Sequence, residues 1–259
     1  MFHRITATSS DRNRCDCYIL PRPRRLGTEG RNEQMGEDVT FKSNGRMASG
    51  YLARPPKPGP GVVVIQEYWG LVPHIRDLAD RFAREGFVAL APDLFHGTTA
   101  KSPDEAGKLM MALRIDEAAK DLAGAIAFLR DGAHATDGKV GTVGFCMGGA
   151  LSLYAACQNT QVGACVVFYG VHPKAQPDLP NLRAPVLGIF AGNDTFVSPA
   201  VVQDLDRRLT AAGKAHEFHT YPDAQHAFFN DTRPQVHDPK ASADAWTKTI
   251  AFLHKELHG

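Results

Sequence analysis

The sequence predicts an α/β fold with a mostly parallel, doubly wound sheet, helices on both faces and an N-terminal hairpin. Two observations lead to this prediction. Short β-branched runs without polar alternation, which are typical of strands covered on both faces, recur along the chain. Segments with helical apolar spacing separate these runs, and such an alternation favours parallel strands joined by crossovers. A chain of 259 residues with 43% hydrophobic content is long enough for one large domain.

We assign residues 35–259 to this single domain and residues 1–34 to a disordered extension. The first 34 residues contain seven arginines, no lysine and little periodic apolar content, so they bury too little surface to offset the entropy of ordering them. The net charge of +1 gives no electrostatic case for a nucleic-acid partner. Without a secretion signal or an apolar run of about 20 residues, we expect a cytoplasmic protein with no membrane partner.

The predicted elements begin with a hairpin over residues 38–53, where an Asn-Gly turn separates two alternating stretches. A β-branched run over residues 61–66 follows and predicts a buried central strand. Apolar residues at helical spacing over 72–83, with a proline in the first turn, predict a helix. Residues 87–91 form the next apolar strand.

The second half of the predicted domain continues the alternation. Ser102-Pro103-Asp104-Glu105 forms a capping box that opens a helix, and a buried apolar stripe over residues 115–129 marks another. The remaining elements are strands at 139–143, 164–168, 185–190 and 215–221, and helices at 150–156, 198–209 and 246–257.

The segment Gly144-Phe145-Cys146-Met147-Gly148 places a thiol between two glycines. A predicted strand precedes it and a small-residue helix follows, which is the arrangement of a nucleophile elbow. Glycines permit the tight turn, and the N-terminus of the following helix directs its positive end towards the sulfur. The pattern therefore predicts that Cys146 is a nucleophile.

A nucleophile of this kind needs a base, and the base needs an acid to orient it. Asp194 follows the predicted strand at 185–190, and His226 follows the strand at 215–221. We expect Asp194 to orient His226, which takes the proton of Cys146 so that the sulfur can form an acyl thioester. The backbone N–H groups of Met147 and Tyr68 are the expected donors to the oxyanion.

Glu67 directly follows the apolar strand at 61–66, at the same end of the sheet as the thiol. Because a nearby anion opposes thiolate formation, Glu67 is predicted to hold Cys146 protonated until substrate displaces the carboxylate. The aromatic residues Trp69, Phe95 and Phe228 are predicted to line the substrate pocket.

With these residues in place, the chain resembles the dienelactone hydrolase family of α/β-hydrolases, which is carboxymethylenebutenolidase-like. The resemblance covers about residues 36–257 and rests on Val62–Gly70, Ala91–Phe95, the Gly-Phe-Cys-Met-Gly-Gly elbow and the ordered acid and histidine. It implies an α/β-hydrolase fold and cofactor-free hydrolysis of an unsaturated lactone carboxylate in aromatic-compound degradation. Glu67 matches the family glutamate that gates the nucleophile.

The sequence departs from the family pattern where well-studied members bind the substrate carboxylate with two arginines. Gly97 and Asn230 occupy those places. Without a cation there, an anionic lactone loses charge-assisted contacts of about 1.5–3 kcal/mol each. His96, Lys101 and Arg233 are alternative cations whose positions the sequence does not give.

Three functions follow from these observations. The first is a cysteine-dependent hydrolase of a small ester or lactone, acting as a monomer or small homo-oligomer. The second keeps Cys146, Asp194 and His226 but acts on a neutral ester or thioester. The third is a redox-sensing or binding protein with a vestigial hydrolase site. No metal site is expected, because the two histidines of residues 216–219 are three positions apart on a predicted strand and point to opposite faces.

Overall fold

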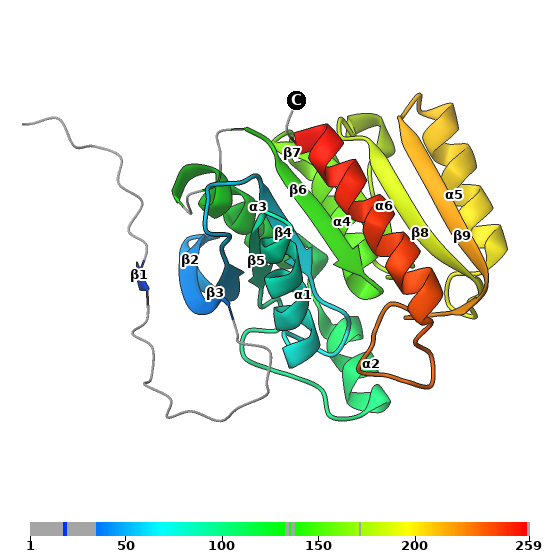
Figure 1. Cartoon of the computed structure of the whole chain (residues 1–259), viewed down its shortest axis with the longest axis horizontal. Helices are drawn as coiled ribbons and strands as arrows, with labels where there is room; N and C mark the ends of the chain where they lie inside the picture. Colours follow the sequence, from blue (N-terminus) through cyan, green and yellow to red (C-terminus); the bar gives the residue numbers. More distant parts are fainter. Residues whose placement is uncertain (1–17, 20–34, 133–134, 136–137, 171, 258–259) are drawn as a thin grey trace, which may run out of the picture.

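The computed structural model describes residues 18–19, 35–132, 135, 138–170 and 172–257. The strands of these residues form one mixed sheet with the order β1-β2-β3-β5-β4-β6-β7-β8-β9 (Figure 1). They are β1 (Tyr18–Ile19), β2 (Glu37–Ser43), β3 (Arg46–Ala53), β4 (Gly61–Ile65), β5 (Val88–Pro92), β6 (Val140–Phe145), β7 (Val162–Phe168), β8 (Val186–Asn193) and β9 (His216–Gln225). The pairs from β1 to β5 are antiparallel, and every pair from β5 to β9 is parallel. The predicted parallel sheet with an N-terminal hairpin is confirmed.

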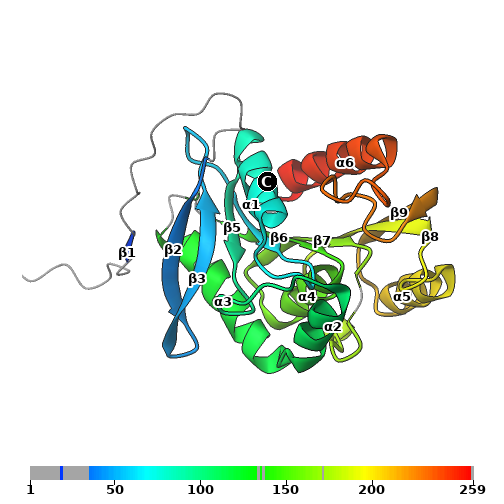
Figure 2. The same cartoon turned by 90° about the horizontal axis from the view of Figure 1, so that it is seen from below.

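Helices cover both faces of this sheet. They are α1 (Pro73–Arg84), α2 (Pro103–Ala112), α3 (Ile115–Gly132), α4 (Met147–Gln158), α5 (Pro199–Ala211) and α6 (Pro239–Leu257). Figure 2 shows α1 and α6 on one face and α3, α4 and α5 on the other. Every residue of β4, β5, β6 and β7 is buried. The double covering explains why these strands lack polar alternation in the sequence.

The predicted capping box opens α2. The Ser102 hydroxyl accepts a hydrogen bond from the backbone N–H of Glu105 at 3.2 Å, and the Glu105 carboxylate accepts one from the backbone N–H of Lys101 at 2.8 Å. These bonds satisfy N–H groups that the first helical turn leaves without partners. The start of α2 therefore follows from local sequence.

Two strands run further than the sequence predicts. β8 continues to Asn193 and β9 to Gln225, past the predicted ends at residues 190 and 221. An irregularity between Ala191 and Asn193 lets the pairing resume, with Asn193 opposite Gln225. Because β9 has β8 as its single neighbour among the described strands, Pro222 costs the sheet no interior hydrogen bond. Asp194 and His226 thus follow their strands directly.

The N-terminal prediction concerns a segment that lies mostly outside the described residues. Within residues 1–34, only Tyr18 and Ile19 are described, and they pair with Thr40 and Val39 of β2. In the part of the chain that the structure describes, no helix is both long and apolar enough to cross a membrane.

Candidate active site

Cys146 lies in the tight turn between β6 and α4. Its φ of 53° and ψ of −120° fall in a region that residues other than glycine seldom occupy, and such strain is common at functional sites. A Cβ on Gly144 would lie 1.9 Å from the Gly148 carbonyl oxygen, and one on Gly148 would lie 2.3 Å from the carbonyl oxygen of Ile65. Both glycines are therefore needed for the strand and helix to approach each other this closely.

Asp194 and His226 meet at the same edge of the sheet. His226 Nδ1 is 2.7 Å from Asp194 Oδ2. The other carboxylate oxygen, Oδ1, accepts backbone hydrogen bonds from Phe196 at 2.7 Å and Val197 at 2.9 Å. The Asp194 carboxylate is held on both oxygens, so Nδ1 of the imidazole is directed at it and Nε2 is left for proton exchange.

Glu67 lies buried just beyond β4, where its Oε2 accepts a hydrogen bond of 2.8 Å from Asn230 Nδ2. Burial raises the pKa of Glu67 above its ordinary value. The hydrogen bond from Asn230 and the charges of Arg233 and His226 act in the opposite direction. The loop after β9 therefore supplies every group that favours the Glu67 anion.

Burial and the Glu67 carboxylate together raise the pKa of the Cys146 thiol to about 12. The backbone N–H groups of Met147 and Tyr68 also contact the sulfur, and both act to lower its pKa. Two consequences follow for the free protein at neutral pH. The thiol carries its proton, and the two N–H groups predicted as oxyanion donors converge on the Cys146 sulfur.

The aromatic residues predicted for the substrate pocket divide between the site and the core. Trp69 is half-buried and packs edge-on against Tyr68, with 4.7 Å between ring centroids. Phe95 is buried on the loop after β5. Phe228 is fully buried between Tyr169 and Tyr221, with centroids 5.6 and 5.2 Å away. With no exposed surface and an aromatic ring on either side, Phe228 is part of the core.

Two aromatic residues that the sequence did not predict for the site contact His226. Tyr169 is buried directly after β7, and its ring centroid lies 5.1 Å from that of the imidazole. Tyr169 follows a strand that lies between β6 and β8, at the same end of the sheet as Cys146 and Asp194, and this position could have identified it as a site residue. Phe196 is 67% exposed and lies 5.0 Å from the imidazole. Nothing in the local sequence distinguishes Phe196 from an ordinary loop residue.

Of the three alternative cations, Arg233 is the one placed beside the site. Its guanidinium carbon lies 5.7 Å from the Trp69 ring centroid, a distance at which a cation and an aromatic face attract each other. Burial raises the pKa values of Glu67 and Tyr68, and the charge of Arg233 partly opposes both shifts. Arg233 therefore brings positive charge to the rim of the candidate site.

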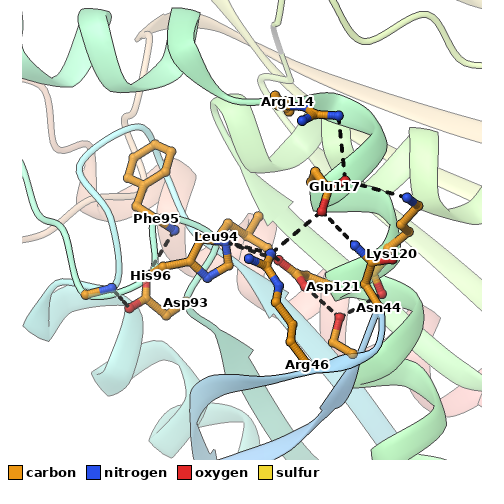
Figure 3. Close-up of polar contacts among 12 residues, drawn as sticks. Asn44, Arg46, Asp93, Leu94, Phe95, His96, Arg114, Glu117, Lys120 and Asp121 are labelled. Atoms are coloured by element: carbon orange, nitrogen blue, oxygen red, sulfur yellow. Dashed lines mark hydrogen bonds and ion pairs between the residues drawn. The ribbon is translucent and has the colours of Figure 1, made fainter.

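His96 belongs to a different cluster, between the β2–β3 turn and α3 (Figure 3). Its Nε2 is 3.3 Å from Asp121 Oδ2 and 3.1 Å from Arg46 Nη2. A hollow of about 650 Å³ beside Arg46 is lined by the same turn and α3, and it includes none of the predicted site residues.

The two other positions considered for a substrate cation also lack one beside the site. Lys101 is exposed just before α2. The next residue after His96, Gly97, has a φ of 92°, which an arginine would rarely adopt.

Comparison with known proteins agrees with this geometry. The model of the dienelactone hydrolase family matches residues 48–257. The chain belongs to the dienelactone hydrolase family. The Aquifex pyrophilus protein named "Protein usf" is 39% identical over 230 residues, which cover 86% of this chain and 100% of that protein. An Aquifex aeolicus protein named "Putative carboxymethylenebutenolidase" is 36% identical with the same coverage.

A solved structure also resembles this dienelactone hydrolase family member. The Klebsiella pneumoniae protein described as "Putative Dienelactone Hydrolase" is 28% identical, with a TM-score of 0.77 over 84% of this chain and 97% of that one. The predicted family and the α/β-hydrolase fold are confirmed. The protein is a dienelactone hydrolase-like hydrolase.

Proposed function

We propose that this dienelactone hydrolase family member is a cysteine-dependent hydrolase of a small ester or lactone. The supporting observation is the convergence of Cys146, the Asp194–His226 pair and two backbone N–H donors at one edge of the sheet. Nucleophilic acyl transfer needs these four components together.

The acylation step uses the nucleophile, the Asp194–His226 pair and the two oxyanion donors together. His226 Nε2 takes the thiol proton as the sulfur attacks the carbonyl carbon, and Asp194 stabilises the imidazolium that forms. The N–H groups of Met147 and Tyr68 donate to the tetrahedral oxyanion. The bond from carbon to the leaving oxygen then breaks, and His226 returns the proton to that oxygen. The product of this step is an acyl thioester on Cys146.

Hydrolysis of the thioester repeats the sequence with water. His226 removes a proton from water, the hydroxide adds to the thioester carbon, and the C–S bond breaks as the sulfur recovers a proton from His226. In a lactone the leaving oxygen remains attached to the acyl chain, so a single open-chain acid is released. No cofactor enters either step.

Glu67→Gln is expected to speed alkylation of Cys146 by iodoacetamide at neutral pH. Removing the anion lowers the pKa of the thiol. At a pH well below that pKa, the thiolate fraction rises about tenfold for each unit by which the pKa falls. We expect an increase of about three- to tenfold, measured by peptide mass spectrometry at Cys146. Glu117→Gln, a change at a half-buried glutamate of α3 that accepts a hydrogen bond from Asn44, serves as the matched control. Equal alkylation of wild type and Glu67→Gln would contradict the gating role.

Arg233 favours an anionic substrate over a neutral one. Arg233→Gln is expected to lower kcat/KM for a lactone carboxylate by about 10- to 100-fold, since a charge-assisted contact contributes about 1.5–3 kcal/mol. The matched neutral lactone ester is expected to react at the wild-type rate, and Arg233→Lys is expected to retain part of the preference. Arg207→Gln on α5 controls for the loss of a surface charge. If both substrates lost activity equally, the neutral ester or thioester would become the better assignment.

The properties of Cys146 disfavour the redox-sensing alternative. Sensor thiols are accessible and have lowered pKa values. Cys146 is 7% exposed, and its pKa is raised to about 12. These values suit a thiol that is activated only when substrate enters the site.

A further inference from the structure

Asn230 makes the direct contact with the Glu67 carboxylate, although the two residues are 163 positions apart in the chain. Asn230 is 2% exposed and Glu67 is 1% exposed, so the contact is shielded from bulk solvent. Asn230 lies in the turn after β9, four residues beyond His226, and its backbone N–H donates to the Ala227 carbonyl at 2.9 Å. The contact therefore ties the carboxylate to the segment that carries His226.

The Asn230 side chain has a defined orientation. Its Oδ1 accepts hydrogen bonds from the backbone N–H of Thr232 at 3.1 Å and from the Thr232 hydroxyl at 2.6 Å. Because Oδ1 is occupied by two donors, the amide cannot rotate to exchange its oxygen and nitrogen without losing both bonds. The Nδ2 group is consequently directed at Glu67.

Ionisable groups from four segments surround Glu67. The loop after β9 contributes His226 and Arg233, the elbow contributes Cys146, and the residues after β4 and β7 contribute Tyr68 and Tyr169. Among the groups that lower the pKa of Glu67, Asn230 acts through a hydrogen bond and carries no charge, whereas Arg233 and His226 act through their charges.

We propose that Asn230 is a positioning residue that holds Glu67 as an anion beside Cys146. This inference rests on the proposed gating role of Glu67. A buried carboxylate without a donor takes up a proton more readily. Loss of the Asn230 amide therefore leaves Glu67 neutral over more of the pH range, and Cys146 loses the negative charge that keeps its thiol protonated.

Asn230→Leu, which has nearly the same shape, provides the test. We expect Cys146 alkylation by iodoacetamide at pH 7 to be faster by about threefold or more, with the pH profile displaced to lower pH. In the Glu67→Gln background, the same substitution is expected to cause no further increase. A merely structural role would instead loosen the site and speed alkylation in both backgrounds, so additive effects would overturn the proposal.

Thr232→Val supplies a milder variant, because Thr232 is exposed and the substitution removes only the hydroxyl donor to Asn230. It is expected to speed alkylation less than Asn230→Leu, and again only when Glu67 is present. It carries the test if Asn230→Leu fails to fold, as judged by thermal unfolding. If Glu67→Gln speeds alkylation but Asn230→Leu and Thr232→Val do not, the role of Asn230 is overturned and the gating role of Glu67 stands. Unchanged rates in all three would overturn the gate as well. The assay needs no ester turnover, so failure of the hydrolase proposal is recorded separately.

Discussion

Cys146→Ala is expected to lower kcat/KM for an ester or lactone by about 10⁴-fold or more. The substitution removes the attacking atom, and only binding and the backbone oxyanion donors remain to accelerate attack by water. Alanine is smaller than cysteine, so the turn between β6 and α4 accepts it without a new clash. Steady-state turnover of a lactone and of an activated aryl ester by the purified variant measures the loss.

Cys157→Ala is the matched control for this result. Cys157 is also a buried cysteine of α4, but it lies away from the elbow, and its replacement is expected to leave kcat/KM at the wild-type value. Intact mass spectrometry after rapid acid quenching is expected to show an acyl adduct on wild type and none on Cys146→Ala. Similar turnover by wild type and Cys146→Ala would rule out the cysteine mechanism.

Asp194→Asn is expected to lower kcat/KM by about 10³- to 10⁴-fold with little change in folding. The amide keeps an oxygen for the N–H groups of Phe196 and Val197. It does not stabilise an imidazolium, and it directs an N–H donor at Nδ1, which favours the wrong tautomer of His226. The pH dependence of kcat/KM for wild type and variant reports the loss of the base.

Asp238→Asn controls for the backbone role of the carboxylate. Asp238 Oδ1 accepts bonds of 3.0 Å from the backbone N–H groups of Lys240 and Ala241. This repeats the pattern that Asp194 forms with the second and third residues after it, in a place without a histidine partner. We expect Asp238→Asn to change the unfolding temperature slightly and kcat/KM hardly at all. Equal losses of kcat/KM in the two variants would show that Asp194 acts only on the loop.

Most elements of the fold were predictable because their signals are local. Apolar runs without polar alternation marked the covered strands, and the Ser102 capping box marked the start of α2. The ends of β8 and β9 were less predictable. Their extension depends on an irregular pairing between Asn193 and Gln225, which brings together two distant segments. A window of sequence around either residue does not contain this information.

The partners of the site residues were harder to predict than the residues themselves. His96 and Arg233 were equivalent candidates in the sequence, yet one lies against Asp121 and the other over Trp69. In the sequence, Asn230 stands out only as a missing arginine, whereas in the structure it donates a hydrogen bond to Glu67. Side-chain direction in loops depends on turn geometry and packing, which have no periodic signature.

The order of strands and helices can be predicted from the sequence, and with it the candidates Cys146, Asp194 and His226. This was possible because carboxyl ends of neighbouring parallel strands meet at one edge of a sheet, so position in the chain implies proximity. Only the tertiary structure decided which cation stands beside the site and which group holds Glu67. Those outcomes depend on contacts between loops that packing brings together across as many as 163 residues.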